Sequence, residues 1–241
     1  MNITMKCTKL LLVVLCVISL QELYAHALWV STERSGIKGT AHEVKVFFAE
    51  PGEKWEPLDG DEWKLVKGFE LWLVNPNGKR LRLDLSPKQD HYAASFIPQE
   101  DGLYHVELIH EHIGVLSFEG MPPFIPYFYA FAPINVGNDS TLNGNENALQ
   151  TRIIPQWDEQ SKMVSFDITT KNGSKGRVTL VTPDGEVKQL GEVNPGKLEF
   201  EANDTGSYQV ELSVRTDGGG SYEGKEYKTA FYTATTVFTI P

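Results

Sequence analysis

The sequence predicts an all-β protein built from a module that occurs twice. Apolar and β-branched residues alternate in short stretches with turn signals between them, and no stretch after residue 25 keeps a helical period over three turns. Two pairs of segments also match each other: LWLVNPNGKRLRL (71–83) with VTLVTPDGEVKQL (178–190), and EDGLYHVEL (100–108) with DTGSYQVEL (204–212). Short strands with regular turns and an internal repeat indicate two β-sandwiches.

Each copy carries the same succession of local signals: a strand, a Pro-Asn-Gly or Pro-Asp-Gly hairpin, a second strand, and later a Gly-x-Tyr step into another strand. The Gly-x-Tyr step is typical of immunoglobulin-like sandwiches, in which the tyrosine hydroxyl bonds to nearby backbone. We therefore expect two tandem immunoglobulin-like β-sandwich domains, a first module at 26–136 and a second at 151–241. Residues 137–150 are polar and rich in Gly and Asn, which predicts a linker.

Alternation predicts seven strands in the first module. They are expected at 27–31, 43–49, 69–74, 79–85, 91–97, 103–110 and near 125–136. The last of these lies within the aromatic and proline-rich segment 121–136, which is expected to cover the gap between the modules rather than to bind a ligand.

The first 25 residues have the layout of a cleaved signal peptide. Lys6 and Lys9 form a basic start, Leu10–Leu20 is an apolar run too short to span a bilayer, and Ala25 ends a short polar stretch. Cleavage after Ala25 would make His26 the first residue of a secreted protein, periplasmic in a bacterium. No direct membrane span is expected in the mature chain.

Composition limits the possible partners. Both cysteines, Cys7 and Cys16, leave with the signal, so the mature chain has no disulfide and must rely on its core. Its 20 basic and 31 acidic residues give a net charge of −11, which disfavours nucleic acid and anionic lipid and suits cation capture. The sequence contains no nucleophile, phosphate-loop or cysteine-based metal motif, so we expect a binding protein rather than an enzyme.

Strand direction sorts the histidines. Since successive strands mostly run in opposite directions, the start of an odd-numbered strand and the end of an even-numbered strand share one end of the sandwich. His26, His91, His110 and His112 fall at one end, and the other two histidines of the chain, His42 and His105, fall at the opposite end and are expected to be structural.

The loop 50–63 belongs to the end with four histidines and is rich in carboxylates. Imidazoles and carboxylates without cysteine suit a borderline divalent metal, so His26, His91, His110 and His112 are the predicted ligands. His110 and His112 lie two residues apart, so on an extended strand both are expected to point to the same side.

His26 as the first residue would offer a ligand that no internal residue has. Its α-amine and imidazole Nδ1 can close a chelate ring on one metal, and a second histidine opposite would complete a histidine brace. The amine must lose its proton, but its ordinary pKa of about 8 allows a bound cation to drive that loss at neutral pH.

The chain resembles a bacterial periplasmic family, the domain of unknown function 4198, over nearly all of 26–241. The resemblance is carried by the Ala-His-x-x-Trp start at Ala25, His26 and Trp29, and by the Gly-Lys-x-Tyr segment at 224–227 that precedes an aromatic-rich last strand. Members of this family are described as periplasmic components of cobalt or nickel uptake systems, so the resemblance implies a metal-linked role outside the cytoplasm and no defined catalytic set.

A looser resemblance links the chain to periplasmic copper-resistance proteins, which share a sandwich with an N-terminal histidine ligand. The mature chain departs from the methionine-rich copper(I) type because it holds only Met121 and Met163. Ni²⁺, Co²⁺ and Cu²⁺ therefore stay open, with Cu²⁺ expected to bind tightest in vitro.

Three functions remain open from the sequence. The first is a binding protein for nickel, cobalt or copper that delivers the ion to an envelope transporter or outer-membrane receptor, with the second module as a spacer or docking module. The second is a structural or adhesive two-domain protein without metal. The third is a copper oxidase with an N-terminal histidine brace.

Overall fold

The computed structural model describes residues 26–137, 149–158 and 160–240. The predicted signal peptide, 1–25, and almost all of the predicted linker, 137–150, lie outside these residues. The chain is nearly all β, as predicted, and its strands form sandwiches. Within the described residues no helix has the length and apolar character needed to cross a bilayer.

The first module follows the predicted strand order closely. Its elements are β1 (Ala27–Thr32), β2 (Ser35–Gly36), β3 (His42–Ala49), α2 (Trp63–Val66), β4 (Glu70–Val74), β5 (Arg80–Arg82), β6 (Ser86–Pro87), β7 (Tyr92–Phe96), β8 (Gly102–His110) and β9 (Phe124–Val136). Each of the seven predicted strands overlaps an observed strand.

The second module contains the longer strands. Its elements are β10 (Arg152–Asp158), β11 (Met163–Thr169), the 3-10 turn η1 (Lys171–Gly173), β12 (Gly176–Val181), β13 (Val187–Val193), β14 (Gly196–Glu201), β15 (Gly206–Tyr222) and β16 (Lys225–Ile240). The last two strands form one long antiparallel hairpin.

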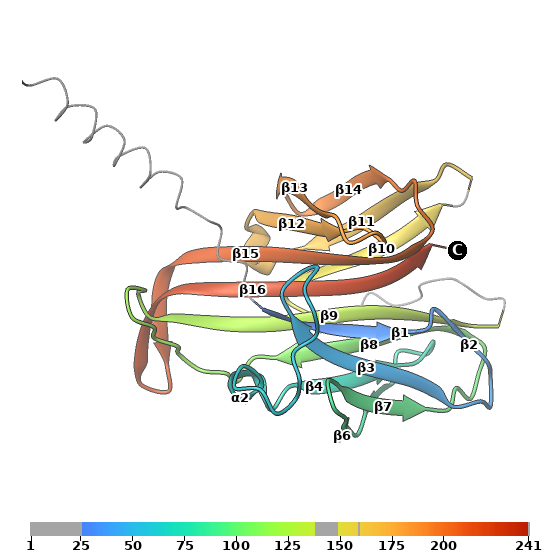
Figure 1. The fold of residues 1–241 in the computed structure, drawn as a ribbon, viewed down its shortest axis with the longest axis horizontal. Helices are drawn as coiled ribbons and strands as arrows, with labels where there is room; N and C mark the ends of the chain where they lie inside the picture. The colour runs from blue at the N-terminus through green and yellow to red at the C-terminus, as the bar shows by residue number, and fades with distance from the viewer. Residues whose placement is uncertain (1–25, 138–148, 159, 241) are drawn as a thin grey trace, which may run out of the picture.

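The strands of the described residues form three sheets. One has the order β1-β3-β7-β6, a second β10-β11-β14, and the third and longest β13-β12-β15-β16-β9-β8-β4-β5, with β2 paired to β9. β9 and β16 pair in parallel, which joins the strands of the first module to those of the second. Figure 1 shows β15, β16 and β9 running along the middle of the molecule, with the remaining strands of the two modules on either side.

Two hydrophobic cores lie on opposite faces of this long sheet. β9 serves both, because Phe128, Ala130 and Ala132 enter the core of the first module whereas Tyr129 and Phe131 enter the core of the second. A strand buried on both faces accounts for the nearly continuous apolar sequence of 124–136. The two predicted sandwiches are therefore present but share a sheet.

The internal repeat is also a repeat of local structure. The Tyr104 hydroxyl donates to the carbonyl of Glu100 at 3.2 Å, and the Tyr208 hydroxyl donates to the carbonyl of Asp204 at 2.9 Å. In both modules a glycine precedes the tyrosine by two residues at positive φ, 132° at Gly102 and 128° at Gly206. The predicted tyrosine corners are thus observed in both copies.

Candidate metal centre

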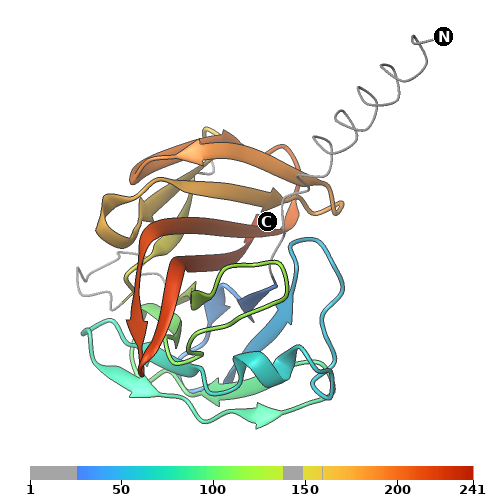
Figure 2. The ribbon, with the colours of Figure 1, turned by 90° about the vertical axis from the view of Figure 1, so that its left-hand side faces the viewer.

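The four histidines predicted as ligands lie at the same end of the first sandwich. β1 begins after His26 and β7 begins after His91, and both strands are antiparallel to β3, so they start together. β8 runs opposite to β1 and ends at His110 (Figure 1), with His112 two residues beyond. Figure 2 views the molecule from this end and shows the loop after β3 rising from the first sandwich toward the second.

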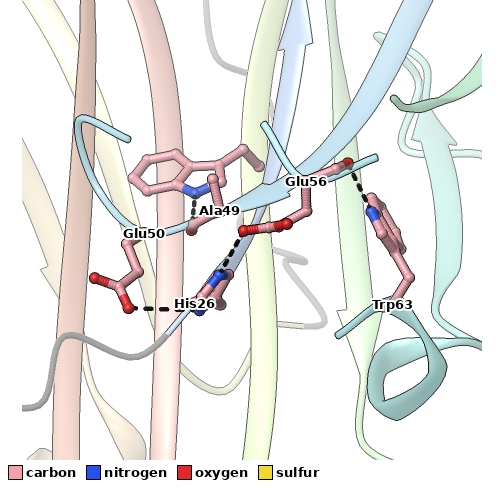
Figure 3. Close-up of polar contacts among 6 residues, drawn as sticks. His26, Ala49, Glu50, Glu56 and Trp63 are labelled. Atoms are coloured by element: carbon pink, nitrogen blue, oxygen red, sulfur yellow. Dashed lines mark hydrogen bonds and ion pairs between the residues drawn. The ribbon is translucent and has the colours of Figure 1, made fainter. Parts of the chain in front are cut away.

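His26 lies between two carboxylates of that loop. Its Nδ1 is 3.5 Å from Oε1 of Glu50, and its Nε2 is 3.1 Å from Oε1 of Glu56 (Figure 3). The imidazole is 29% exposed and packs against the Phe48 ring, with 5.1 Å between centroids. The two ring nitrogens therefore face different carboxylates, Nδ1 that of Glu50 and Nε2 that of Glu56.

The loop is fixed by backbone and indole hydrogen bonds. The Glu56 N–H donates to the Phe48 carbonyl at 2.9 Å, and Nε1 of Trp63 donates to the Glu56 carbonyl at 3.0 Å. Nε1 of Trp29 donates to the Ala49 carbonyl at 3.0 Å. These bonds hold the backbone immediately before Glu50 and at Glu56, so both side chains extend from fixed backbone near His26.

An aromatic plug fills this end of the core. Phe48 packs on Trp63 with 5.4 Å between ring centroids, and Trp63 packs edge-on against Tyr92, also at 5.4 Å. Trp63 is fully buried at the start of α2. Since His26 lies on Phe48 and His91 directly precedes Tyr92, the predicted ligands are arranged around this plug rather than around a shared point.

His91 has its own partners. Its Nδ1 is 2.7 Å from Oδ1 of Asp90, and its ring packs on Phe47, which in turn stacks on Trp55 at 4.6 Å. Phe47 and Phe48 are neighbours on β3 and point to opposite faces of the sheet, so His91 and His26 lie on opposite sides of this strand.

His110 and His112 differ sharply in exposure. His110 points into the first core and is 2% exposed, and neither of its ring nitrogens has a hydrogen-bond partner. Burial, reinforced by the nearby His112, lowers the pKa of His110 to about 4 despite an opposing effect of the Val66 backbone, so its imidazole is neutral at pH 7. His112 is exposed, with Nδ1 3.4 Å from the Tyr222 hydroxyl. The expectation that both side chains point the same way is therefore wrong, because β8 ends between them.

The two histidines expected to be structural have structural partners. His42 is buried and its Nε2 is 2.8 Å from Oγ1 of Thr32; burial lowers the pKa of His42. Nε2 of His105 is 3.3 Å from Oε1 of Glu107, and its ring stacks on Phe131.

Across residues 26–137, 149–158 and 160–240, no three histidine, cysteine, aspartate or glutamate side chains are already grouped as a metal site. At His26 two carboxylates contact one imidazole, one at each ring nitrogen, and this arrangement is not such a group. Sequence reasoning placed Glu50 and Glu56 in an acidic loop but had no signal to select them from its other carboxylates. The aromatic plug was missed, although Trp63 at the end of that loop was a signal for it.

Comparison with known protein families and with curated proteins finds no match. Among solved structures, a DUF4785 family protein from Legionella pneumophila subsp. pneumophila str. Philadelphia 1 is 12% identical with a TM-score of 0.33, over 89% of this chain and 57% of that protein. Salmonella alpha-2-macroglobulin reacted with methylamine is 12% identical with a TM-score of 0.31, over 88% of this chain and 15% of that one. Native alpha-2-macroglobulin of E. coli is 11% identical with a TM-score of 0.30, over 88% and 14%. The chain thus spans less than two thirds of each of these proteins, and none of them indicates a function.

Proposed function

We propose that the chain, once residues 1–25 are removed, is a periplasmic or otherwise secreted protein that binds a divalent transition metal at His26 and delivers it to an envelope transporter. The ion is the cargo, and nickel, cobalt and copper are the candidates, as the resemblance to the domain of unknown function 4198 also implies.

The observation that supports this function is the pairing of each His26 nitrogen with a different carboxylate. Nδ1 is the nitrogen that can close a chelate ring with the α-amine of the same residue, and it faces Glu50, a potential oxygen ligand. Nε2 faces Glu56, which can accept the Nε2 proton and so hold the tautomer that leaves Nδ1 free for metal. An amine, an imidazole and a carboxylate are a donor set that Ni²⁺, Co²⁺ and Cu²⁺ all accept.

The same pairing favours metal binding over the brace-type oxidase. A histidine brace needs a second imidazole opposite the first, whereas the groups facing His26 are carboxylates. A structural role without metal is the second candidate, and it is favoured by one observation: among the described residues no three donors are grouped before metal arrives.

The test is a calorimetric titration with Ni²⁺ and Cu²⁺ of protein that begins at His26, beside protein that keeps one extra residue before His26. The proposal expects the extension to weaken binding at least about 100-fold, because it removes the amine from the chelate ring. Equal binding by the two forms would reject the terminal chelate, and absence of binding would favour the structural role. His91→Ala, His110→Ala and His112→Ala in the same titration test the ligands predicted from the sequence.

A further inference from the structure

The internal repeat places two buried glutamates at equivalent positions. In the matched segments EDGLYHVEL and DTGSYQVEL, Glu107 of β8 corresponds to Glu211 of β15. The sheet repeats the correspondence, since Glu107 pairs across the sheet with Trp72, and Glu211 pairs with Thr179, which matches Trp72 in the other repeated segment. Glu107 is fully buried and Glu211 is 5% exposed.

In the first module an arginine neutralises the buried carboxylate. Nη2 of Arg80 donates to Oε2 of Glu107 at 2.9 Å, while Oε1 of Glu107 is 3.3 Å from Nε2 of His105. The Arg80 guanidinium lies over the Trp72 ring, 4.7 Å from its centroid. Both carboxylate oxygens of Glu107 are thereby satisfied.

In the second module that cation is missing. Arg80 pairs with Val74 in the first hairpin, and the equivalent pair in the second hairpin is Val187 with Val181, so a valine occupies the place of the arginine. Oε1 of Glu211 accepts a hydrogen bond from Oγ of Ser213 at 2.8 Å, but Oε2 is buried without a partner. An unpaired buried carboxylate oxygen costs free energy and requires an explanation.

The loop of the first module lies over this part of the second module. The Gly52 N–H is 3.4 Å from Oε1 of Gln209, and a Cβ added at Gly52 would come within 2.8 Å of Cγ2 of Val187. Gln209 and Glu211 are two residues apart on β15, so both side chains lie on the face that the loop covers. Burial, and next the charge of Glu50, raise the pKa of Glu211 to about 7, against the lowering effect of its hydrogen bond from Ser213.

We propose that Glu211 is a further ligand of the divalent cation at His26 and Glu50, so that the metal does for Glu211 what Arg80 does for Glu107. This inference rests on the proposed function and adds a ligand from the second module, which the sequence assigned only a spacer or docking role. The metal then bridges the two modules through one loop and one central strand.

The donor set specifies the charge of the cargo. The two carboxylate ligands carry two negative charges, and the amine and imidazole bind as neutral groups, so a divalent cation balances the charge of its ligands whereas copper(I) leaves one negative charge uncompensated. An ion shared with Glu211 requires the Glu50 side chain to turn away from its contact with His26, and this side chain is 35% exposed. A hollow of about 230 Å³, lined by Gly52, Trp55 and Gln209 among others, opens on the same face of β15.

The experiment compares single charge removals in protein that begins at His26. Glu211→Gln keeps the shape of the side chain, and we expect it to weaken Ni²⁺ and Cu²⁺ binding at least about 100-fold in calorimetric titration. Glu53→Gln is the matched control, because it removes the same charge from the exposed part of the same loop, and it should change affinity less than about threefold. Thermal unfolding of each variant without metal checks that it is folded.

A second variant supplies the missing positive charge with a side chain of the protein itself. Val187→Arg should place a guanidinium where Arg80 stands in the first module and should weaken metal binding as Glu211→Gln does. Wild-type affinity in both Glu211→Gln and Val187→Arg would overturn the inference while leaving the site at His26 intact. If binding is lost only when a residue is added before His26, Glu211 is likewise not a ligand and the site at His26 remains. Absence of binding by the wild-type protein would reject both the inference and the proposed function.

Discussion

Without metal, Glu211 should destabilise the folded protein at neutral and alkaline pH. Its pKa in the fold is about 7 compared with an ordinary value of 4.5, because the carboxylate is buried and faces the charge of Glu50. Because the folded pKa lies above the unfolded value, the cost of ionising Glu211 is absent below about pH 4.5 and is complete once pH has risen through about 7. Since one pKa unit corresponds to about 1.4 kcal/mol, the ionised side chain costs about 3 kcal/mol at pH 8.

Glu211→Gln removes this cost and should therefore stabilise the protein. The gain should reach about 2–3 kcal/mol at pH 8 and fall below about 1 kcal/mol at pH 5, where most of the wild-type carboxyl is protonated in the fold. Urea unfolding at both pH values, with a chelator present to remove metal, measures the two free energies.

Glu107→Gln supplies the opposite expectation from the equivalent position. Here the carboxylate is paired with Arg80, so the substitution breaks a charged hydrogen bond and should destabilise the protein by about 1–3 kcal/mol. If Glu211→Gln stabilises the protein equally at pH 5 and pH 8, or destabilises it as Glu107→Gln does, then Glu211 is not an uncompensated buried carboxyl.

Other properties of the fold can be tested in the same way. Because the pKa of His110 is lowered to about 4, the protein should lose at most about 3 kcal/mol of stability as pH falls from about 6.5 to 4. His110→Leu should reduce this loss in urea unfolding. An unchanged dependence of the unfolding free energy on pH would contradict the prediction. Tyr208→Phe removes the hydroxyl that closes the second tyrosine corner and should cost about 1–2 kcal/mol, whereas a neutral effect would show that the corner is dispensable. A fragment 151–240 should be poorly folded by circular dichroism and protease digestion, because Tyr129 and Phe131 of β9 belong to its core; a stable fragment would show that the modules are independent.

The fold could be predicted well because its signals are local. Alternation located seven of the nine strands of the first module to within a few residues and missed only the two-residue strands β2 and β6, and the two Gly-x-Tyr steps identified both tyrosine corners. The sharing of one sheet was not predicted, because the parallel pairing of β9 with β16 joins residues about 105 apart in sequence and leaves no local pattern. The one indication of the shared sheet in the sequence is that β9 is apolar on both faces, and an edge strand covered by other residues would show the same apolar run.

The candidate site could be predicted only to the end of the sandwich. Strand direction brings His26, His91 and His110 to one end, since an error of one residue in a boundary does not move a residue to the other end. Whether side chains then meet depends on what fills that end, and Phe48 and Trp63 occupy the space in which the imidazoles were expected to gather. The packing of Phe48 against Trp63 leaves no pattern in the sequence from which it could be predicted.

Glu211 shows how a repeat can reveal a site that its own segment hides. The pairing of Glu107 with Glu211, and of Arg80 with Val187, can be read directly from the matched segments. A carboxylate that faces water needs no arginine, however, and alternation in a two-layer sandwich predicts that Glu211 faces water, because it lies on the side of β15 opposite the core. The loop after β3 lies over that face, and Glu211 there is buried. The substitution of valine for arginine thus becomes evidence for an external cation only when the two modules are seen in contact.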